Sequence, residues 1–209
     1  MSDQGIIDAF HKLYYSRHAE IWKKTLWLGV PALKLPQDLW TYQEILMEVK
    51  PDLIIETGTF LGGSAYFMAS VCDLLKNGRI ISVDIEAQPG RPQHPRITYL
   101  RGSSTAPEVV GRMKLEAEDE EKVLVILDSH HGRDHVLEEM EFYGRMVSPG
   151  SYLIVEDGNI NGHPVFPEFG PGPTEAIQAY LPAHPEFEVD RSREKFLVTF
   201  NPGGYLRKK

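Results

Sequence analysis

The sequence has one cysteine, Cys72, among 209 residues, so it cannot form an intramolecular disulfide. We therefore expect a reducing, cytoplasmic setting. It has no hydrophobic run of transmembrane length, and residues 1–4 do not begin a basic segment with an apolar core, so we expect neither a membrane span nor a signal peptide. The net charge is −8 without a basic stripe, which argues against nucleic acid as a partner.

The remaining composition is that of a globular protein, with 42% hydrophobic and 25% charged residues. We expect an N-terminal helical extension over residues 1–50 and one Rossmann-like unit over 51–209. Apolar spacing predicts helices over 5–24 and 39–49, the second one capped by Asp38. The aromatic residues of the extension predict that it covers the sheet or a second copy of the chain, so we expect a homo-oligomer, a dimer or larger.

The stretch from Pro51 to Ala65 resembles the opening unit of a nucleotide-binding sheet. The apolar residues 53–55 predict a buried strand that ends in Glu56, and a glycine-rich turn and a helix follow. Gly58 would permit the tight turn beside a bound cofactor, but the Gly-x-x-x-Gly-Gly spacing differs from that of dinucleotide sites. Glu56 would repel a pyrophosphate and suits the ammonium of S-adenosylmethionine. An ordinary βα turn remains the alternative.

The next two predicted strands end in polar residues that suit the rest of this cofactor. Asp84 closes a strand a little over twenty residues after the glycines, where a βαβ unit places the acid that binds ribose hydroxyls. Glu86 is the substitute for that role, and a solvated loop acid is the alternative. A strand over 97–100 precedes Ser103 and Ser104, which could border the adenine.

Carboxylates follow two further predicted strands, 123–127 and 152–155. Asp128 ends the first, and Glu156 and Asp157 end the second. Because the carboxyl ends of parallel strands converge on one crevice, these acids can meet, and they repel one another unless a cation neutralises them. All-oxygen ligands favour magnesium, with calcium or manganese possible. Helix caps or exposed loop charges are the alternative for each acid.

Two adjacent histidines, His130 and His131, follow Asp128. No Cys/His spacing typical of zinc accompanies them, so zinc is disfavoured. We predict that His131 is the general base, because one loop turn could bring it over the metal and the ordinary histidine pKa of about 6.5 suits proton transfer near neutrality. A surface histidine is the alternative.

The C-terminal third contains a long Pro/Gly-rich segment, residues 161–173, which is typical of a mobile lid. After it we expect a short helix capped by Thr174. Two apolar runs, Phe187–Val189 and Phe196–Phe200, predict a final antiparallel hairpin.

Several short motifs together resemble the cephalosporin hydroxylase (CmcI-like) and rhamnosyl O-methyltransferase family. The resemblance covers roughly residues 25–200. It implies an α/β, Rossmann-like class I S-adenosylmethionine-dependent methyltransferase fold with a mostly parallel seven-stranded sheet. The motifs are Trp27-Leu28-Gly29-Val30-Pro31, Lys34-Leu35-Pro36-Gln37-Asp38, Ile55-Glu56-Thr57-Gly58-Thr59, Gly62-Gly63-Ser64, Val83-Asp84, Leu127-Asp128-Ser129-His130-His131 and Val155-Glu156-Asp157.

The site also resembles that of catechol-type and macrolide-sugar O-methyltransferases, and this implies roles for single residues. Catechol-type enzymes have an amide where Asp157 stands, so this site is more acidic and its substrate can differ. The implied roles are methionine binding by Glu56 and Ser64, ribose binding by Asp84, metal binding by Asp128, Glu156 and Asp157, with Asp128 also beside the cofactor, and general base catalysis by His131.

The predicted function is methyl transfer from S-adenosylmethionine, assisted by Mg²⁺ or another hard divalent cation, to a hydroxyl of a small molecule such as a sugar, a diol or a secondary metabolite. Three alternatives stay open. A nicotinamide oxidoreductase is disfavoured by the glycine spacing, and a hydroxylase of the non-haem iron type would need two histidines and one carboxylate. The third is a non-catalytic S-adenosylmethionine-binding subunit of a biosynthetic complex.

Overall fold

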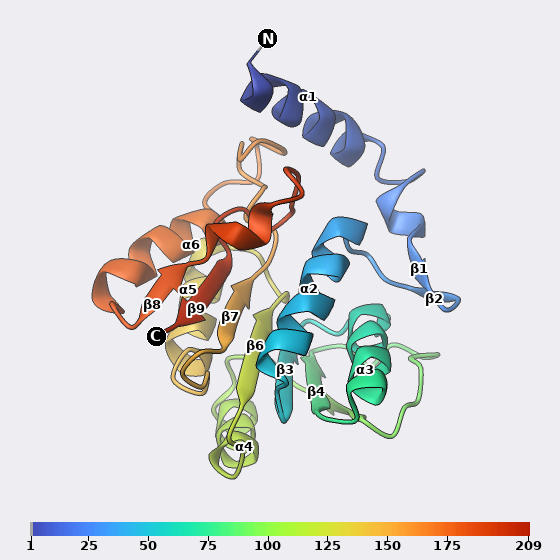
Figure 1. Ribbon diagram of the computed structural model, residues 1–209, viewed down its shortest axis with the longest axis vertical. Coiled ribbons are helices and arrows are strands. Elements are labelled where there is room, and N and C mark those ends of the chain that lie inside the picture. Colours follow the sequence, from blue (N-terminus) through green and yellow to red (C-terminus); the bar gives the residue numbers. More distant parts are fainter. Residues whose placement is uncertain (1) are drawn as a thin grey trace.

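A computed structural model describes residues 2–209, and its centre is one seven-stranded sheet (Figure 1). Its strands are β3 (Leu53–Thr57), β4 (Arg79–Asp84), β5 (Ile97–Arg101), β6 (Val123–Leu127), β7 (Tyr152–Val155), β8 (Phe187–Val189) and β9 (Tyr205–Lys208). The order across the sheet is β5-β4-β3-β6-β7-β9-β8, and only β9 runs antiparallel to its neighbours. The predicted mostly parallel seven-stranded sheet is confirmed.

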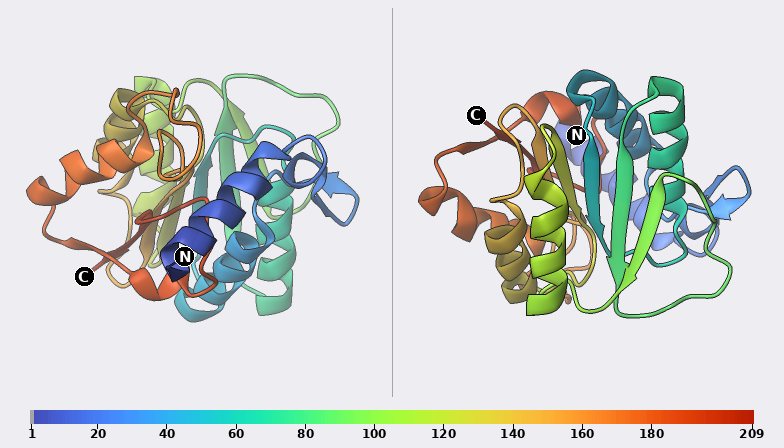
Figure 2. Two further views of the ribbon diagram at one scale, coloured as in Figure 1. Left: turned by 90° about the horizontal axis from the view of Figure 1, so that it is seen from above. Right: turned by 90° about the horizontal axis from the view of Figure 1, so that it is seen from below.

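Helices cover both faces of this sheet (Figure 2). The helices are α1 (Asp3–Ser16), α2 (Pro36–Val49), α3 (Gly63–Leu75), α4 (Pro107–Glu118), α5 (Arg133–Tyr143) and α6 (Pro173–Tyr180). Residues of α2 and α3 form the core on one face, and residues of α4, α5 and α6 form the core on the other. A small hairpin of β1 (Leu26–Trp27) and β2 (Val30–Pro31) lies outside the main sheet, and short 3₁₀ turns cover Trp22–Lys24, Leu181–Ala183 and Arg191–Glu194.

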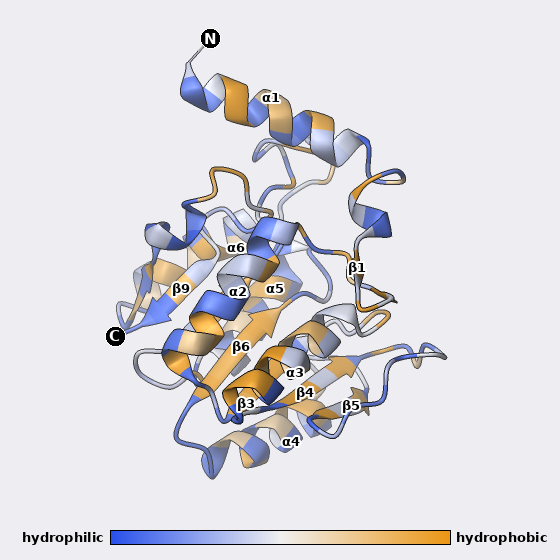
Figure 3. Ribbon diagram, turned by 45° about the vertical axis from the view of Figure 1, so that its right-hand side comes forward, coloured by the Kyte–Doolittle hydropathy of each residue, from blue (hydrophilic) through white to orange (hydrophobic). Residues whose placement is uncertain are grey.

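Strand β6, in the middle of the sheet, is apolar along its whole length, as expected where helices cover both faces (Figure 3). In β6, Val125 and Leu127 point into one core, whereas Leu124 and Ile126 point into the other. No helix within residues 2–209 has the length and hydropathy that crossing a membrane requires.

Strand β3 lies between β4 and β6, so the strand order changes direction there and a crevice opens at the carboxyl ends. Gly58 directly follows β3 with a φ of +86°, and a Cβ atom on it would lie 1.8 Å from the backbone oxygen of Asp128. Only glycine fits this close approach of two strand ends.

The N-terminal helix α1 stands apart from the two helical layers (Figure 1). His11 attaches it to the rest of the chain: Asn159 Nδ2 donates to His11 Nε2 over 2.9 Å, and the ring stacks on Phe200 with centroids 5.7 Å apart. Burial lowers the pKa of His11 to about 4, so the ring is neutral at neutral pH.

In contrast to α1, helix α2 contributes Tyr42 and Ile45 to the core of the sheet. The boundary predicted at residue 51 falls after α2 and would assign it to the N-terminal extension.

The prediction that Phe196–Phe200 forms the second strand of the final hairpin is wrong, because β8 pairs with β9 instead. Val198 and Phe200 are buried in a small cluster with Leu35, against which the aromatic residues of α1 pack. Their apolar character therefore reflects loop packing and not a strand.

Three predicted helix ends also differ from the structure. The first helix ends at Ser16 and not near residue 24. Helix α6 starts at Pro173 with Gly172 at its cap, and Thr174 Oγ1 instead donates to the Gly158 carbonyl over 2.7 Å.

Asp38 is not the cap of α2, which starts at Pro36. Its buried carboxylate instead accepts hydrogen bonds from Thr199 Oγ1 (2.5 Å), the Phe200 amide (2.9 Å) and the Tyr205 hydroxyl (2.9 Å). Asp38 therefore ties α2 to the C-terminal segment.

We predict that Asp38→Ala lowers the free energy of unfolding by about 3 kcal/mol or more, because three buried donors lose their acceptor. Urea unfolding followed by tryptophan fluorescence measures this change. The control is Asp119→Ala, at the exposed end of α4, which should cost about 0.5 kcal/mol or less. Equal effects of the two substitutions would contradict the role of Asp38.

Candidate functional site

A cavity of about 580 Å³ lies at the carboxyl ends of β3, β4, β5 and β6. Its wall brings together five of the predicted cofactor residues, which are Gly58, Asp84, Ser103, Ser104 and Asp128. These residues come from four separate strand ends, as expected for the ligand crevice of an open parallel sheet.

Glu56 and Ser64 lie beside this cavity and not in its wall. Glu56 has no exposed surface, and its carboxylate accepts hydrogen bonds from Ser64 Oγ and, over 2.5 Å, from Ser82 Oγ. Burial raises the pKa of Glu56 to about 7, although the two serine hydroxyls oppose the shift. Ser64 lines a second, much smaller cavity of about 30 Å³ that Gly58 and Asp128 also line. A ligand there would meet Glu56 through Ser64.

Asp84 is held by the turn that follows β3. Its Oδ2 accepts the Phe60 amide over 2.7 Å and lies 3.2 Å from an Arg91 guanidinium nitrogen, while its Oδ1 accepts the Glu86 amide over 2.9 Å. Glu86 lines the same cavity and is exposed. Both acids predicted for the ribose are therefore at the cavity, and Asp84 also shapes its wall.

The sequence analysis missed one histidine of the cavity wall. His135 Nε2 lies 3.2 Å from both Ser104 Oγ and Ser129 Oγ. The carboxylate of the buried Glu139, whose Oε1 lies 3.6 Å from His135 Nε2, raises the pKa of His135. The sequence around His135 does not predict that it lines the cavity, because its partners Ser104 and Ser129 follow two different strands.

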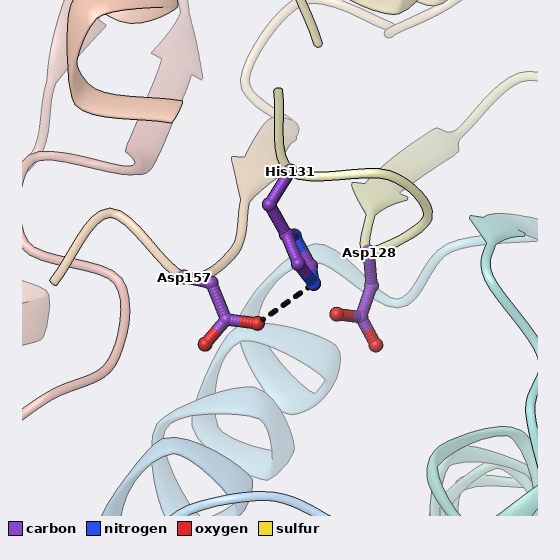
Figure 4. Close-up of side chains that lie close together, drawn as sticks. All are labelled: Asp128, His131 and Asp157. Carbon is purple, nitrogen blue, oxygen red and sulfur yellow. Dashed lines mark ion pairs between the residues drawn. The ribbon is translucent and has the colours of Figure 1, made fainter. Parts of the chain in front are cut away.

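Asp128, His131 and Asp157 lie together beyond the cavity (Figure 4). One ligand atom from each lies within 4.8 Å of the others, and His131 Nε2 is 3.2 Å from Asp157 Oδ2. Asp157 holds a positive φ of 55°, and Asn201 Oδ1 accepts its amide hydrogen over 3.1 Å. Such a backbone conformation in a non-glycine residue is typical of functional sites.

Glu156, the third predicted metal ligand, points elsewhere. One of its oxygens accepts a hydrogen bond from the Tyr42 hydroxyl over 2.6 Å, and the other is paired with the ammonium of Lys34. Lys34 also pairs with Asp128. The sequence analysis gave Lys34 no role, since its two partners are 94 and 122 residues away along the chain.

The charges of this group suit a divalent cation. Burial raises the pKa of the Asp128 carboxyl, which the Lys34 ammonium opposes and the neighbouring charge of Asp157 reinforces. With Glu156, the three carboxylates exceed the one ammonium by two negative charges. Oxygen donors with this excess charge match the preference of Mg²⁺ and similar hard cations.

The sheet order, the glycine turn and the cavity at the strand ends are those of the class I S-adenosylmethionine-dependent methyltransferase fold. The chain belongs to the family described as Rhamnosyl O-methyltransferase/CmcI, which matches residues 19–209. The predicted family and enzyme class are thereby confirmed.

Named relatives and solved structures agree with this assignment. The chain is 42% identical to a rhamnosyl O-methyltransferase of Mycobacterium leprae (strain TN), over 98% of this chain and 91% of that protein. A CmcI structure described with Mg and S-adenosylmethionine has a TM-score of 0.69 at 20% identity, over 93% of this chain and 84% of that one. A structure of MycE, a methyltransferase of mycinamycin biosynthesis, with Mg and S-adenosylhomocysteine has a TM-score of 0.55 at 19% identity, over 86% and 47%. The predicted cofactors, S-adenosylmethionine and Mg²⁺, are those described for the CmcI structure, and the MycE structure holds Mg with the demethylated product of the same cofactor.

We predict that Asp84→Ala weakens S-adenosylmethionine binding at least about tenfold, since a charge-assisted pair of hydrogen bonds is worth roughly 1.5–3 kcal/mol. Isothermal calorimetry measures the affinity. Glu86→Ala, at the other acid of the cavity, is the matched control and should weaken binding less than about threefold. The opposite ranking would make Glu86 the residue that binds the ribose.

Proposed function

We propose that this chain transfers the methyl group of S-adenosylmethionine to a hydroxyl of a rhamnosyl or closely similar sugar, with the help of Mg²⁺. The observation that supports this most is the position of Asp128, which belongs both to the wall of the cofactor-sized cavity and to the group with His131 and Asp157. The sugar is suggested by the name of the Mycobacterium leprae relative.

On the cofactor side, Asp84 would accept hydrogen bonds from the ribose hydroxyls. Ser103 and Ser104 would border the adenine, together with His135. Ser64, oriented by Glu56, would contact the methionine part where the smaller cavity adjoins the cofactor cavity at Gly58 and Asp128. These contacts would align the sulfonium with the neighbouring acidic group, and such alignment accounts for much of the rate of a methyl transfer.

On the acceptor side, Asp128 and Asp157 would hold the cation, because their carboxylates face one another across His131. Glu156 would act through Lys34 and Tyr42, which take up its two oxygens. When bound, S-adenosylmethionine supplies an activated methyl group and the cation lowers the pKa of the acceptor hydroxyl.

His131 would take the proton of the acceptor hydroxyl. Its Nε2 lies 3.2 Å from Asp157 Oδ2, and when Asp157 holds the cation instead, this nitrogen would be the one that receives the proton. His130 would serve the cofactor instead, because it lines the cofactor cavity and packs edge-on against His135 with ring centroids 5.4 Å apart.

The two other candidate functions have less support. A non-haem iron hydroxylase uses two histidines and one carboxylate, whereas the group here has one histidine and two carboxylates. A non-catalytic cofactor-binding subunit would not need Asp128, His131 and Asp157 to face one another at the cavity.

We expect the protein to release S-adenosylhomocysteine when it is given S-adenosylmethionine and a rhamnoside. A panel of alkyl and aryl rhamnosides, with non-sugar diols for comparison, tests the acceptor class. Excess EDTA should abolish turnover, and Mg²⁺ should restore it. Cofactor binding without turnover across the panel would favour the non-catalytic subunit, and full activity in EDTA would contradict the role of the cation.

Within the same experiment, Asp157→Asn should weaken Mg²⁺ binding, measured by calorimetry, at least about tenfold more than Glu156→Gln does. Both substitutions keep the size of the side chain and remove one charge. An equal loss in the two variants would place Glu156 in direct contact with the cation.

We predict that His131→Ala lowers the turnover number by roughly 10²–10⁴, the usual effect of losing a general base. Its affinity for S-adenosylmethionine should stay within about threefold of the wild type, because His131 lies outside the cofactor cavity. The control His130→Ala should do the reverse and weaken cofactor binding more than turnover. Wild-type turnover in His131→Ala at pH 7 would rule out this base.

We also propose that the protein works in the cytoplasm as a homo-oligomer. Its one cysteine, Cys72, is a buried free thiol, which suits a reducing compartment. Ile6, Phe10 and Leu13 of α1 are 55%, 48% and 51% exposed at helical spacing, and a second copy could cover them.

A further inference from the structure

Lys34 is a buried ammonium group placed between carboxylates of two strand ends. The residue is 5% exposed, and its Nζ is paired with Asp128, after β6, and with Glu156, after β7. Burial alone would lower the pKa of Lys34, but the two carboxylates outweigh this and raise it above its ordinary value. Lys34 is therefore charged in the folded protein.

The segment that carries Lys34 is held in place on both sides. A Cβ atom on Gly63, the first residue of α3, would lie 2.0 Å from the Pro31 carbonyl oxygen, so β2 packs against this helix end without space between them. Leu35, the next residue after Lys34, is fully buried. The ammonium thus occupies a defined position, as a buried charge must if its pairing is to offset its desolvation.

The position of Lys34 determines the net charge of the side chains that would surround a cation. Asp128, Glu156 and Asp157 carry three negative charges, of which Lys34 cancels one. We propose that Lys34 is a positioning residue that keeps the site at two net negative charges and so tunes it toward divalent ions. This inference deepens the proposed function, because it assumes the cation site of that proposal.

The size of the effect follows from Coulomb's law. At the effective dielectric constant of about 20 found in proteins, a unit charge beside a bound cation changes the affinity by at least about tenfold for each charge that the cation carries. Loss of the Lys34 ammonium should raise the affinity for a trivalent cation more than that for a divalent one, because the trivalent cation carries one more charge that the ammonium repels. Removing the ammonium should therefore raise the ratio of Tb³⁺ to Mg²⁺ affinity by about tenfold or more, after allowance for screening.

The test measures that ratio in the full-length protein without any acceptor. Tb³⁺ binding is followed by its tyrosine-sensitised luminescence, and Mg²⁺ binding by competition and by calorimetry. Lys34→Met should raise the ratio about tenfold or more, whereas Lys34→Arg, which keeps the charge, should stay within about threefold of the wild type. Lys195→Met, at a half-exposed lysine paired with Glu44 on the surface, is the matched control and should leave the ratio unchanged.

Two further variants separate charge from packing. Lys34→Met/Glu156→Gln restores two net charges and should return the ratio to the wild-type value. Glu156→Gln alone leaves one net charge and should lower the ratio about tenfold or more. These two variants keep the proposal testable even if Lys34→Met alone does not fold, which near-ultraviolet circular dichroism reveals.

Two results would overturn the inference in different ways. Folded variants whose ratio does not follow the net charge would overturn the role of Lys34 and leave the proposed cation site intact. A wild-type protein that binds neither Mg²⁺ nor Tb³⁺ would overturn the proposed cation site, and the role of Lys34 with it.

Discussion

The active end of this molecule depends on the electrostatic balance between one ammonium and the carboxylates that the sheet brings together. The parallel strands β6 and β7 end side by side, so the residues that follow them, Asp128 and Glu156, lie close together. Without compensation, their mutual repulsion and their burial would disfavour the fold. Lys34 supplies that compensation from a segment that is far away in the sequence, and in our proposal the remaining charge would attract a divalent cation.

The same strand ends explain why binding and chemistry can share one small region. The cavity for the cofactor lies at the carboxyl ends of β3, β4, β5 and β6, and Asp128 is part of its wall. His131 and Asp157 lie next to Asp128, outside that wall (Figure 4). A methyl group and an acceptor oxygen can therefore meet with little movement of the backbone, which is the condition for catalysis by positioning.

Much of this arrangement can be predicted from the sequence, because the strands of the parallel part of the sheet are recognisable as short apolar runs that are each followed by a polar residue. That pattern places Asp84, Asp128 and Asp157 at one edge of the sheet. The orientation of side chains cannot be predicted in the same way. Nothing local distinguishes Asp157, which faces His131, from Glu156, which faces Lys34.

The failures of sequence reasoning share a physical cause. Asp38 has the pattern of a helix cap, but its carboxylate is used by donors 161 to 167 residues away. Val198 and Phe200 have the pattern of a strand, but they are covered by Leu35 and by α1. In each case a contact between distant parts of the chain outweighs the local preference.

The contact between Gly58 and Asp128 has a consequence for anyone who wishes to alter this protein. The backbone oxygen of Asp128 lies 1.8 Å from where a Cβ of residue 58 would be. The glycine turn and the end of β6 therefore pack so tightly that a change in the backbone of one would displace the other. Loops transplanted from another enzyme to change the binding of S-adenosylmethionine would also shift Asp128, whose carboxylate we propose to serve the acceptor. Donor specificity and acceptor specificity are therefore not independent modules in this scaffold, and libraries that vary one should vary the other at the same time.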